Sequence, residues 1–140
     1  MSKIRILALP VDREPYITNI ENSLKNMQNF IGGYIEAETI LQAPEVVLVC
    51  DEEGMLKGRA VNPSVPDLQP YVGWGLKIVG DCFLCGVAGE DFADLPDKWK
   101  NILLKLAKEA YREKHIERIE SNKEAAYGTE GQKHYGGRNG

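Results

Sequence analysis

The chain of 140 residues is long enough for one domain built around a single hydrophobic core. Its 17 basic and 21 acidic side chains give a formal net charge of −4, which argues against direct nucleic-acid binding and suits a basic protein partner. No apolar run approaches the roughly 18 residues of a membrane span, and the first residues resemble a strand more than a signal peptide. With an odd number of cysteines, three, we expect a protein of the reducing cytoplasm without disulfides.

The N-terminal part of the chain predicts a strand pair followed by a short helix. Residues 4–9 and 16–20 have strand-like patterns and are expected to pair as a hairpin. Asn22 or Ser23 can cap a helix by accepting a free backbone N–H of its first turn. The pair Gly32-Gly33 predicts the end of this helix, because glycine enters the left-handed C-cap conformation without steric cost.

Further strands are expected on both sides of a proline-rich loop. Residues 34–40 alternate with period two, and the β-branched run at 46–50 predicts a buried strand. Residues 55–61 are interpreted as a short returning strand, and residues 78–87 as the last strand. The loop at 62–75 contains three prolines, and loops of this length in small domains are usually functional.

A long C-terminal helix is expected to begin near Asp97 and to end near residue 124. Asp94 is interpreted as its cap, and Pro96 and Asp97 suit its first turn. Its first half carries an apolar stripe, which we expect to pack on the sheet: Trp99, Ile102, Leu103, Leu106 and Ala110. The second half is mostly charged, so it either projects into solvent or contacts a partner, including a second copy in a homo-oligomer.

These elements predict an α+β fold. We expect an antiparallel or mixed sheet of about five strands, with one short helix and one long C-terminal helix packed on a face. Residues 1–126 would form the single domain. Residues 127–140 are rich in glycine and would form a flexible tail.

The spacing Cys82-x-x-Cys85 is found in redox pairs and in half zinc sites. Positions three apart in a strand face opposite sides, so these two thiols are not expected to converge. A zinc site would need Cys50, His115 or His134 as further ligands. We therefore interpret the cysteines as buried structural thiols, and we expect neither a metal nor another cofactor.

The acidic residues do not form a convincing catalytic pair. Glu36 and Glu38 would lie on one face of one strand, and residues 51–53 are interpreted as solvated acids in a turn. Acid–base catalysis needs two carboxyl groups whose environments separate their pKa values. An enzyme would therefore need Glu36 or Cys82 in a pocket that forms only on assembly.

Four residues in and beside the proline-rich loop are better candidates for binding. Arg59, Asn62, Tyr71 and Trp74 combine a guanidinium, an amide and two aromatic rings. Such sets stack on nucleobases or anchor protein partners. The structural alternative is that Trp74 fills the edge of the core and the prolines only shape the connection.

One segment carries a family resemblance. The run Gln28-x-x-Ile-Gly-Gly-Tyr-Ile-Glu36, with Val47-Leu-Val, Asp51-Glu-Glu-Gly, Val61-Asn-Pro, Ile78-Val-Gly and Gly86, resembles the domain-of-unknown-function family numbered 3846, found in phages, plasmids and other mobile elements. The resemblance spans residues 4–95 and leaves out the long helix and the tail. It implies no catalytic residues, and Glu36 and Asn62 are the polar positions that match its pattern.

The resemblance, the acidic charge and the absence of catalytic motifs together imply a non-catalytic binding protein. We expect an accessory, anti-defence factor that inhibits a host defence protein, such as a nuclease, by direct contact. The expected binding residues are Glu36, Arg59, Asn62, Tyr71 and Trp74. One alternative is an oligomeric sponge that sequesters a nucleotide-like signalling molecule, and another is an uncharacterised enzyme.

Overall fold

The computed structural model describes the backbone of residues 2–65 and 78–127, and side chains through residue 114. Its elements are β1 (Lys3–Leu9), β2 (Tyr16–Glu21), α1 (Leu24–Ile31), β3 (Ile35–Leu41), β4 (Val46–Asp51), β5 (Cys82–Ala88), β6 (Asp91–Ala93) and α2 (Asp97–Tyr127). None of the helices described is long and apolar enough to cross a membrane. Apart from Tyr127, the predicted flexible tail lies outside the described residues.

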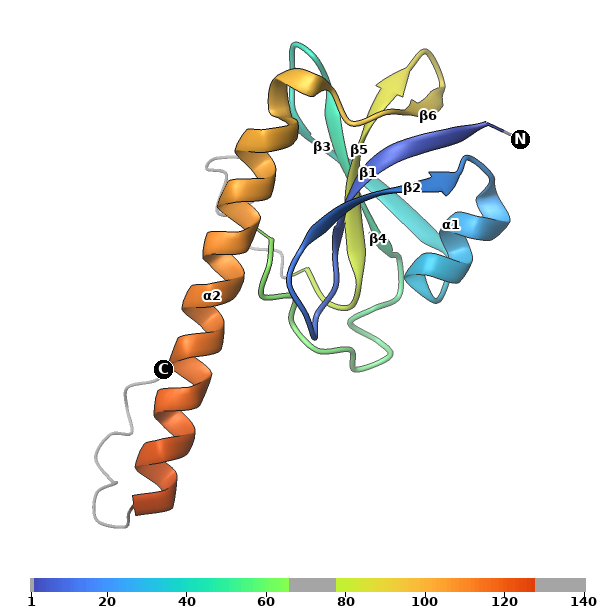
Figure 1. Ribbon diagram of the computed structural model, residues 1–140. Helices are drawn as coiled ribbons and strands as arrows, with labels where there is room; N and C mark the ends of the chain where they lie inside the picture. The colour runs from blue at the N-terminus through green and yellow to red at the C-terminus, as the bar shows by residue number, and fades with distance from the viewer. Residues whose placement is uncertain (1, 66–77, 128–140) are drawn as a thin grey trace.

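The strands form one antiparallel sheet in the order β2-β1-β5-β4-β3, with β6 paired to β5. The buried strands β1, β4 and β5 form its centre, and the more exposed strands β2 and β3 form its edges. Figure 1 shows α1 on one side of this sheet and α2 on the other. The predicted α+β fold, with one short and one long C-terminal helix, is therefore confirmed.

Each face of the sheet carries its own hydrophobic core. The α2 face is built from Leu7, Leu9, Ile40, Val46, Leu48, Cys50, Cys82, Leu84, Leu95, Leu103 and Ala107. The α1 face is built from Ile4, Ile6, Ala8, Met27, Ile31, Val47, Val49, Phe83 and Cys85. Side chains that alternate along each central strand supply both cores, which explains why β4 is buried along its whole length.

The predicted start and end of α1 are confirmed. The Ser23 hydroxyl accepts a hydrogen bond from the Asn26 backbone N–H at 3.2 Å, as an N-cap residue does. Gly32 lies in the left-handed region with φ of 86° and donates its N–H to the Gln28 carbonyl at 2.7 Å. The helix buries only Met27 and Ile31, so it lies as a short cover over one end of the sheet.

The predicted cap of α2 is wrong. The Asp94 carboxylate accepts a hydrogen bond from the Arg5 backbone N–H at 2.7 Å and thereby joins the chain before α2 to β1. The first hydrogen-bonded turn instead uses the Pro96 carbonyl, which accepts from the N–H groups of Trp99 and Lys100. The Arg5 guanidinium also binds the Asp97 carboxylate at 2.7 Å, which fixes the start of the helix against the sheet.

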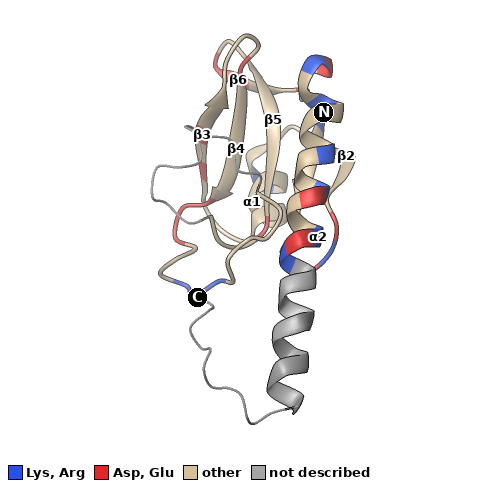
Figure 2. Cartoon of the chain, turned by 90° about the vertical axis from the view of Figure 1, so that its left-hand side faces the viewer, with Lys and Arg blue, Asp and Glu red and all other residues tan. Residues whose placement is uncertain are grey.

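The predicted apolar stripe of α2 is confirmed only in part. Leu103 is buried as predicted, together with Ala107, but Ile102 and Leu106 are exposed. Basic and acidic positions are interspersed along the described surface of this helix, as Figure 2 shows. In Figure 1 the helix continues well past the end of the sheet.

Two predicted strands also need correction. Residues 55–58 form turns rather than a strand, with local backbone hydrogen bonds such as Lys57 N–H to Glu53 and Arg59 N–H to Gly54. At the end of the predicted strand, Val61 forms an isolated antiparallel bridge with Val79. The final predicted strand begins only at Cys82, since Gly80 has a positive φ of 80° that breaks the extended conformation. The short strand β6 was not predicted.

Candidate functional site

The end of β4 carries a buried carboxylate that binds two cations from one loop. The Asp51 side chain has 0% exposure, and its Oδ2 accepts hydrogen bonds from Lys57 Nζ at 2.9 Å and Arg59 Nε at 2.8 Å. Its Oδ1 accepts from the Glu53 backbone N–H at 2.8 Å. The interpretation of Asp51 as a solvated acid is therefore wrong, because the loop folds back over it.

Burial alone would raise the pKa of Asp51, because the charged form loses its hydration. The hydrogen bonds from Lys57, the Glu53 N–H and Arg59 outweigh this effect and lower the pKa below its ordinary value. Asp51 is therefore ionised at neutral pH, and it acts as an anchor for the loop rather than as a proton donor.

The same two cations complete the end of α1. The carbonyl of Gly32 accepts from Arg59 Nη2 at 2.8 Å and from Lys57 Nζ at 3.4 Å. The last turn of α1 contains no basic residue. Since a helix C-terminus carries partial negative charge, the loop supplies the complementary cations that the helix lacks.

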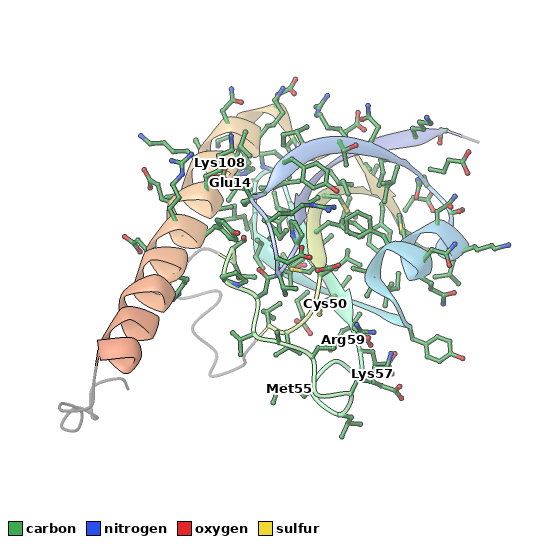
Figure 3. The ribbon with its side chains drawn as sticks, turned by 60° about the horizontal axis from the view of Figure 1, so that its bottom comes forward. Glu14, Cys50, Met55, Lys57, Arg59 and Lys108 are labelled. Carbon is green, nitrogen blue, oxygen red and sulfur yellow. The ribbon has the colours of Figure 1, made fainter. Side chains whose placement is uncertain are left out.

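Glycines make this close approach of the Arg59 side chain feasible. A β-carbon at Gly80 would lie 2.7 Å from Arg59 Cδ, and one at Gly32 would lie 3.0 Å from its Nη2. The guanidinium therefore lies between the C-cap of α1 and the chain that leads into β5. Figure 3 shows Met55, Lys57 and Arg59 on one loop at this end of the sheet.

A cavity of about 370 Å³ opens beside this anchored loop. It is lined by Gln28, Asn29, Gly32, Gly33, Tyr34, Glu53 and Lys57. The first five residues come from the end of α1 and the turn into β3, whereas Glu53 and Lys57 come from the loop. The volume lies in the range of about 300–1,000 Å³ that is typical of ligand pockets.

Large apolar side chains are exposed around the same loop. Leu56 is 87% exposed, and Met55 and Val61 are also exposed. Tyr34 is 65% exposed, and its carbonyl accepts the Glu52 N–H at 2.9 Å, which places it at the base of the loop. We call Tyr34, Met55, Leu56 and Val61 the apolar loop surface.

The predicted binding residues are only partly brought together. Arg59 and Asn62 both lie beside Gly80. The Arg59 Cδ atom would be 2.7 Å from a β-carbon at this position, and the Asn62 Nδ2 group donates to the Gly80 carbonyl at 2.8 Å. Glu36 lies on the edge strand β3, opposite Cys50 of β4. Tyr71 and Trp74 lie outside the described residues.

Asn62 is a structural link inside the fold. It is buried, and its Nδ2 group also donates to the Leu9 carbonyl at 2.7 Å, while its Oδ1 accepts the Ser64 N–H at 2.8 Å. The amide thus joins the end of β1 to the chain that enters β5. This arrangement uses the donor and acceptor groups of Asn62 within the protein.

The cysteine arrangement follows the predicted strand geometry. Cys82 lies in the core under α2 and Cys85 in the core under α1, so the two thiols face opposite sides of the sheet. Burial raises the pKa of Cys50 to about 11 and that of Cys85 to about 12, and it raises that of Cys82 strongly. These thiols are therefore protonated at neutral pH, the form that is a poor nucleophile.

No cluster of three or more His, Cys, Asp or Glu side chains suited to a metal occurs among the described residues. The side chains of His115 and His134, considered as zinc ligands, lie outside them. The residues that matter most at the site, Asp51 and Lys57, were not singled out from the sequence. Their signal was a run of acidic residues at 51–53 followed by Lys57 and Arg59 in the same segment, a pattern that also fits an ordinary solvated loop.

Comparison with known protein families identifies a match. A family model described as Domain of unknown function (DUF3846) matches residues 4–108, which is more than half of the chain. The match extends past the predicted limit at residue 95 and into the first turns of α2. No curated protein and no solved structure matches the chain.

Proposed function

The chain belongs to the DUF3846 family of domains of unknown function, and from that premise we propose that it is a non-catalytic protein-binding module. The observation that carries the proposal is the apolar loop surface, formed by Tyr34, Met55, Leu56 and Val61. Contiguous exposed apolar patches mark interaction sites, and these four exposed residues lie in one loop or, for Tyr34, at its base. Here the loop is also anchored, so it can present these side chains in one conformation.

The chemistry of the described residues favours binding over catalysis. Asp51 is committed to Lys57 and Arg59, and the thiols are buried. An anchored loop also lowers the conformational entropy that association would otherwise cost. The apolar loop surface is therefore a preorganised docking site for a protein.

The partner that we propose is a host defence protein, such as a nuclease, and the setting is a phage or another mobile element. The acidic net charge of −4 supports this choice, because nucleic-acid-binding proteins present basic surfaces that attract acidic partners. The domain would inhibit its target by occupying that surface.

Site-specific photo-crosslinking tests this proposal. A photoreactive benzoylphenylalanine replaces Leu56 in one variant and Glu90, an exposed residue in the turn between β5 and β6, in a control variant. Both are exposed to extract of a bacterial host, and the protein captured is identified, purified and titrated against the unlabelled domain.

The proposal predicts a discrete adduct at position 56 and none at position 90. It also predicts that Leu56→Ser weakens binding of the purified partner by at least about tenfold, because hot-spot side chains contribute roughly 2 kcal/mol or more. Equal crosslinking at both positions, or unchanged affinity of the Leu56→Ser variant, would refute it.

A further inference from the structure

We infer that the cavity between α1 and the loop receives an arginine side chain of the bound protein. This inference rests on the proposed function and adds the chemistry of the residue that the partner presents. It follows from the unpaired carboxylate of Glu53, the excess of acidic residues in the loop and the presence of Tyr34 in the lining of the cavity.

The unpaired charge in the cavity is negative. The Lys57 ammonium, the cation that lines the cavity, already binds the Asp51 carboxylate at 2.9 Å and the Gly32 carbonyl at 3.4 Å. Glu53 lines the cavity as well, and within the described residues its solvent-exposed carboxylate has no ion pair or side-chain hydrogen bond. An entering cation therefore finds a free carboxylate, whereas an entering anion would have to compete with Asp51 for Lys57.

The loop beside the cavity also carries a net negative charge. Between Asp51 and Arg59 the loop carries three carboxylates, including Glu52 and Glu53, against two cations. The partial negative charge at the C-terminal end of α1 is already matched by Lys57 and Arg59, which bind the Gly32 carbonyl, so the excess of one carboxylate in the loop sets the sign. The local field thus favours a positively charged group at the mouth of the cavity.

The shape and the polar groups favour a guanidinium over an ammonium. Tyr34 is mostly exposed at the cavity, and aromatic rings bind the flat face of arginine by cation–π attraction. Gln28 and Asn29 supply amide oxygens that can accept from the several N–H groups of a guanidinium. Arginine is also less strongly hydrated than lysine, so it loses less on entering a partly enclosed site.

A titration with N-acetyl-argininamide tests the inference without a partner protein. Backbone amide shifts of the ¹⁵N-labelled full chain are followed by NMR, with N-acetyl-lysinamide and inorganic phosphate as comparison probes. The matched variants are Glu53→Gln, which removes the free carboxylate, and Glu90→Gln, which makes the same change at an exposed turn away from the cavity. Tyr34→Phe and Tyr34→Ala separate the ring from its hydroxyl.

The inference predicts saturable shifts at Gly33, Tyr34 and Glu53 with the arginine probe, and at least threefold weaker binding of the lysine probe. Glu53→Gln and Tyr34→Ala should each weaken arginine binding at least fivefold, whereas Tyr34→Phe and Glu90→Gln should leave it unchanged. Tighter binding of phosphate than of the arginine probe, non-saturable shifts, or an unchanged affinity of Glu53→Gln would overturn it.

The two proposals can fail separately. If crosslinking at position 56 captures a partner while the arginine probe gives no saturable shift, the cavity inference is wrong and the protein-binding function stands. If the arginine probe binds as predicted but position 56 gives no specific adduct, the cavity is a site for a basic group and the apolar loop surface is not the docking site.

Discussion

At the residue scale, Asp51 determines the conformation of the candidate site. One buried carboxylate receives Lys57, Arg59 and a backbone N–H, and the two cations continue to the C-cap of α1. The loop that carries the apolar side chains is thereby joined to β4 and to α1. Removal of this carboxylate would leave two cations close together with no anion between them.

We expect Asp51→Asn to lower the free energy of unfolding by about 1–3 kcal/mol. Breaking a fully buried ion pair costs more, but the side chains of Lys57 and Arg59 are 35% and 30% exposed, so water partly compensates them. Urea unfolding of the full chain measures the change. Glu52→Gln, at an exposed neighbouring carboxylate, serves as the control and should change the stability by less than about 0.5 kcal/mol.

The lowered pKa of Asp51 also predicts a pH dependence. The unfolded chain binds this proton more readily than the folded chain, so the contribution is complete above the ordinary value of 3.8 and is lost as the pH falls through the lower folded pKa. Between pH 5 and the acid limit of the fold, wild-type stability should fall more steeply than that of Asp51→Asn. Parallel curves would show that Asp51 does not titrate as described.

Asn62 stabilises the fold by neutral hydrogen bonds, in contrast to the ion pairs of Asp51. Its side-chain amide joins three segments of backbone. We expect Asn62→Ala to cost about 2–3 kcal/mol, since it leaves buried carbonyl groups without their donors. Asn101→Ala, at an exposed position of α2, is the matched control. If both variants unfold at the same urea concentration, the buried hydrogen bonds of Asn62 contribute little.

At the scale of the element, α2 is held to the sheet by a narrow set of side chains. Leu103 and Ala107 are buried, whereas Leu106 is exposed on the same helix. We expect Leu103→Ala to cost about 2–4 kcal/mol, as buried leucines do, and Leu106→Ala to cost less than about 1 kcal/mol. Comparable losses in urea unfolding would mean that a different face of α2 contacts the sheet.

The helix and the sheet also show what the sequence could reveal. The two ends of α1 and the central strand β4 followed local rules, so Ser23, Gly32 and residues 46–50 were correctly interpreted. The predicted strand at 55–61 was not, because its conformation depends on the ion pairs of Lys57 and Arg59 with the buried Asp51 and on contacts to Gly32 and Gly80 across the fold. Local sequence patterns carry no information about such long-range pairing, and a strand-like run of residues was therefore misinterpreted.

The same lack of long-range information in local sequence patterns explains why the candidate site was only partly predicted. Arg59 and Asn62 stood out because their residue types suit binding, yet both are engaged within the fold. Tyr34 and Glu53 were seen only as parts of a strand and a turn. Their joint position at the cavity arises from the turn after α1 and the folded-back loop, which are tertiary features.

At the scale of the whole molecule, the family match and the hydrophobic core end at nearly the same place. The match stops at residue 108, and the last core residue among the described side chains is Ala107. The part of α2 that follows continues past the end of the sheet in Figure 1. This coincidence indicates that the family domain is the unit that buries both faces of the sheet.

We therefore expect a chain shortened to residues 1–114 to fold with a free energy of unfolding within about 1 kcal/mol of the full chain, because it keeps every core residue among the described side chains. A chain shortened to residues 1–102 loses Leu103 and Ala107 and should not unfold cooperatively. Urea titrations followed by circular dichroism measure both. If the 1–114 chain fails to fold, residues beyond 114 must contribute to the core.

If the 1–114 chain folds, it should also bind N-acetyl-argininamide like the full chain, because the cavity is formed by residues 28–57.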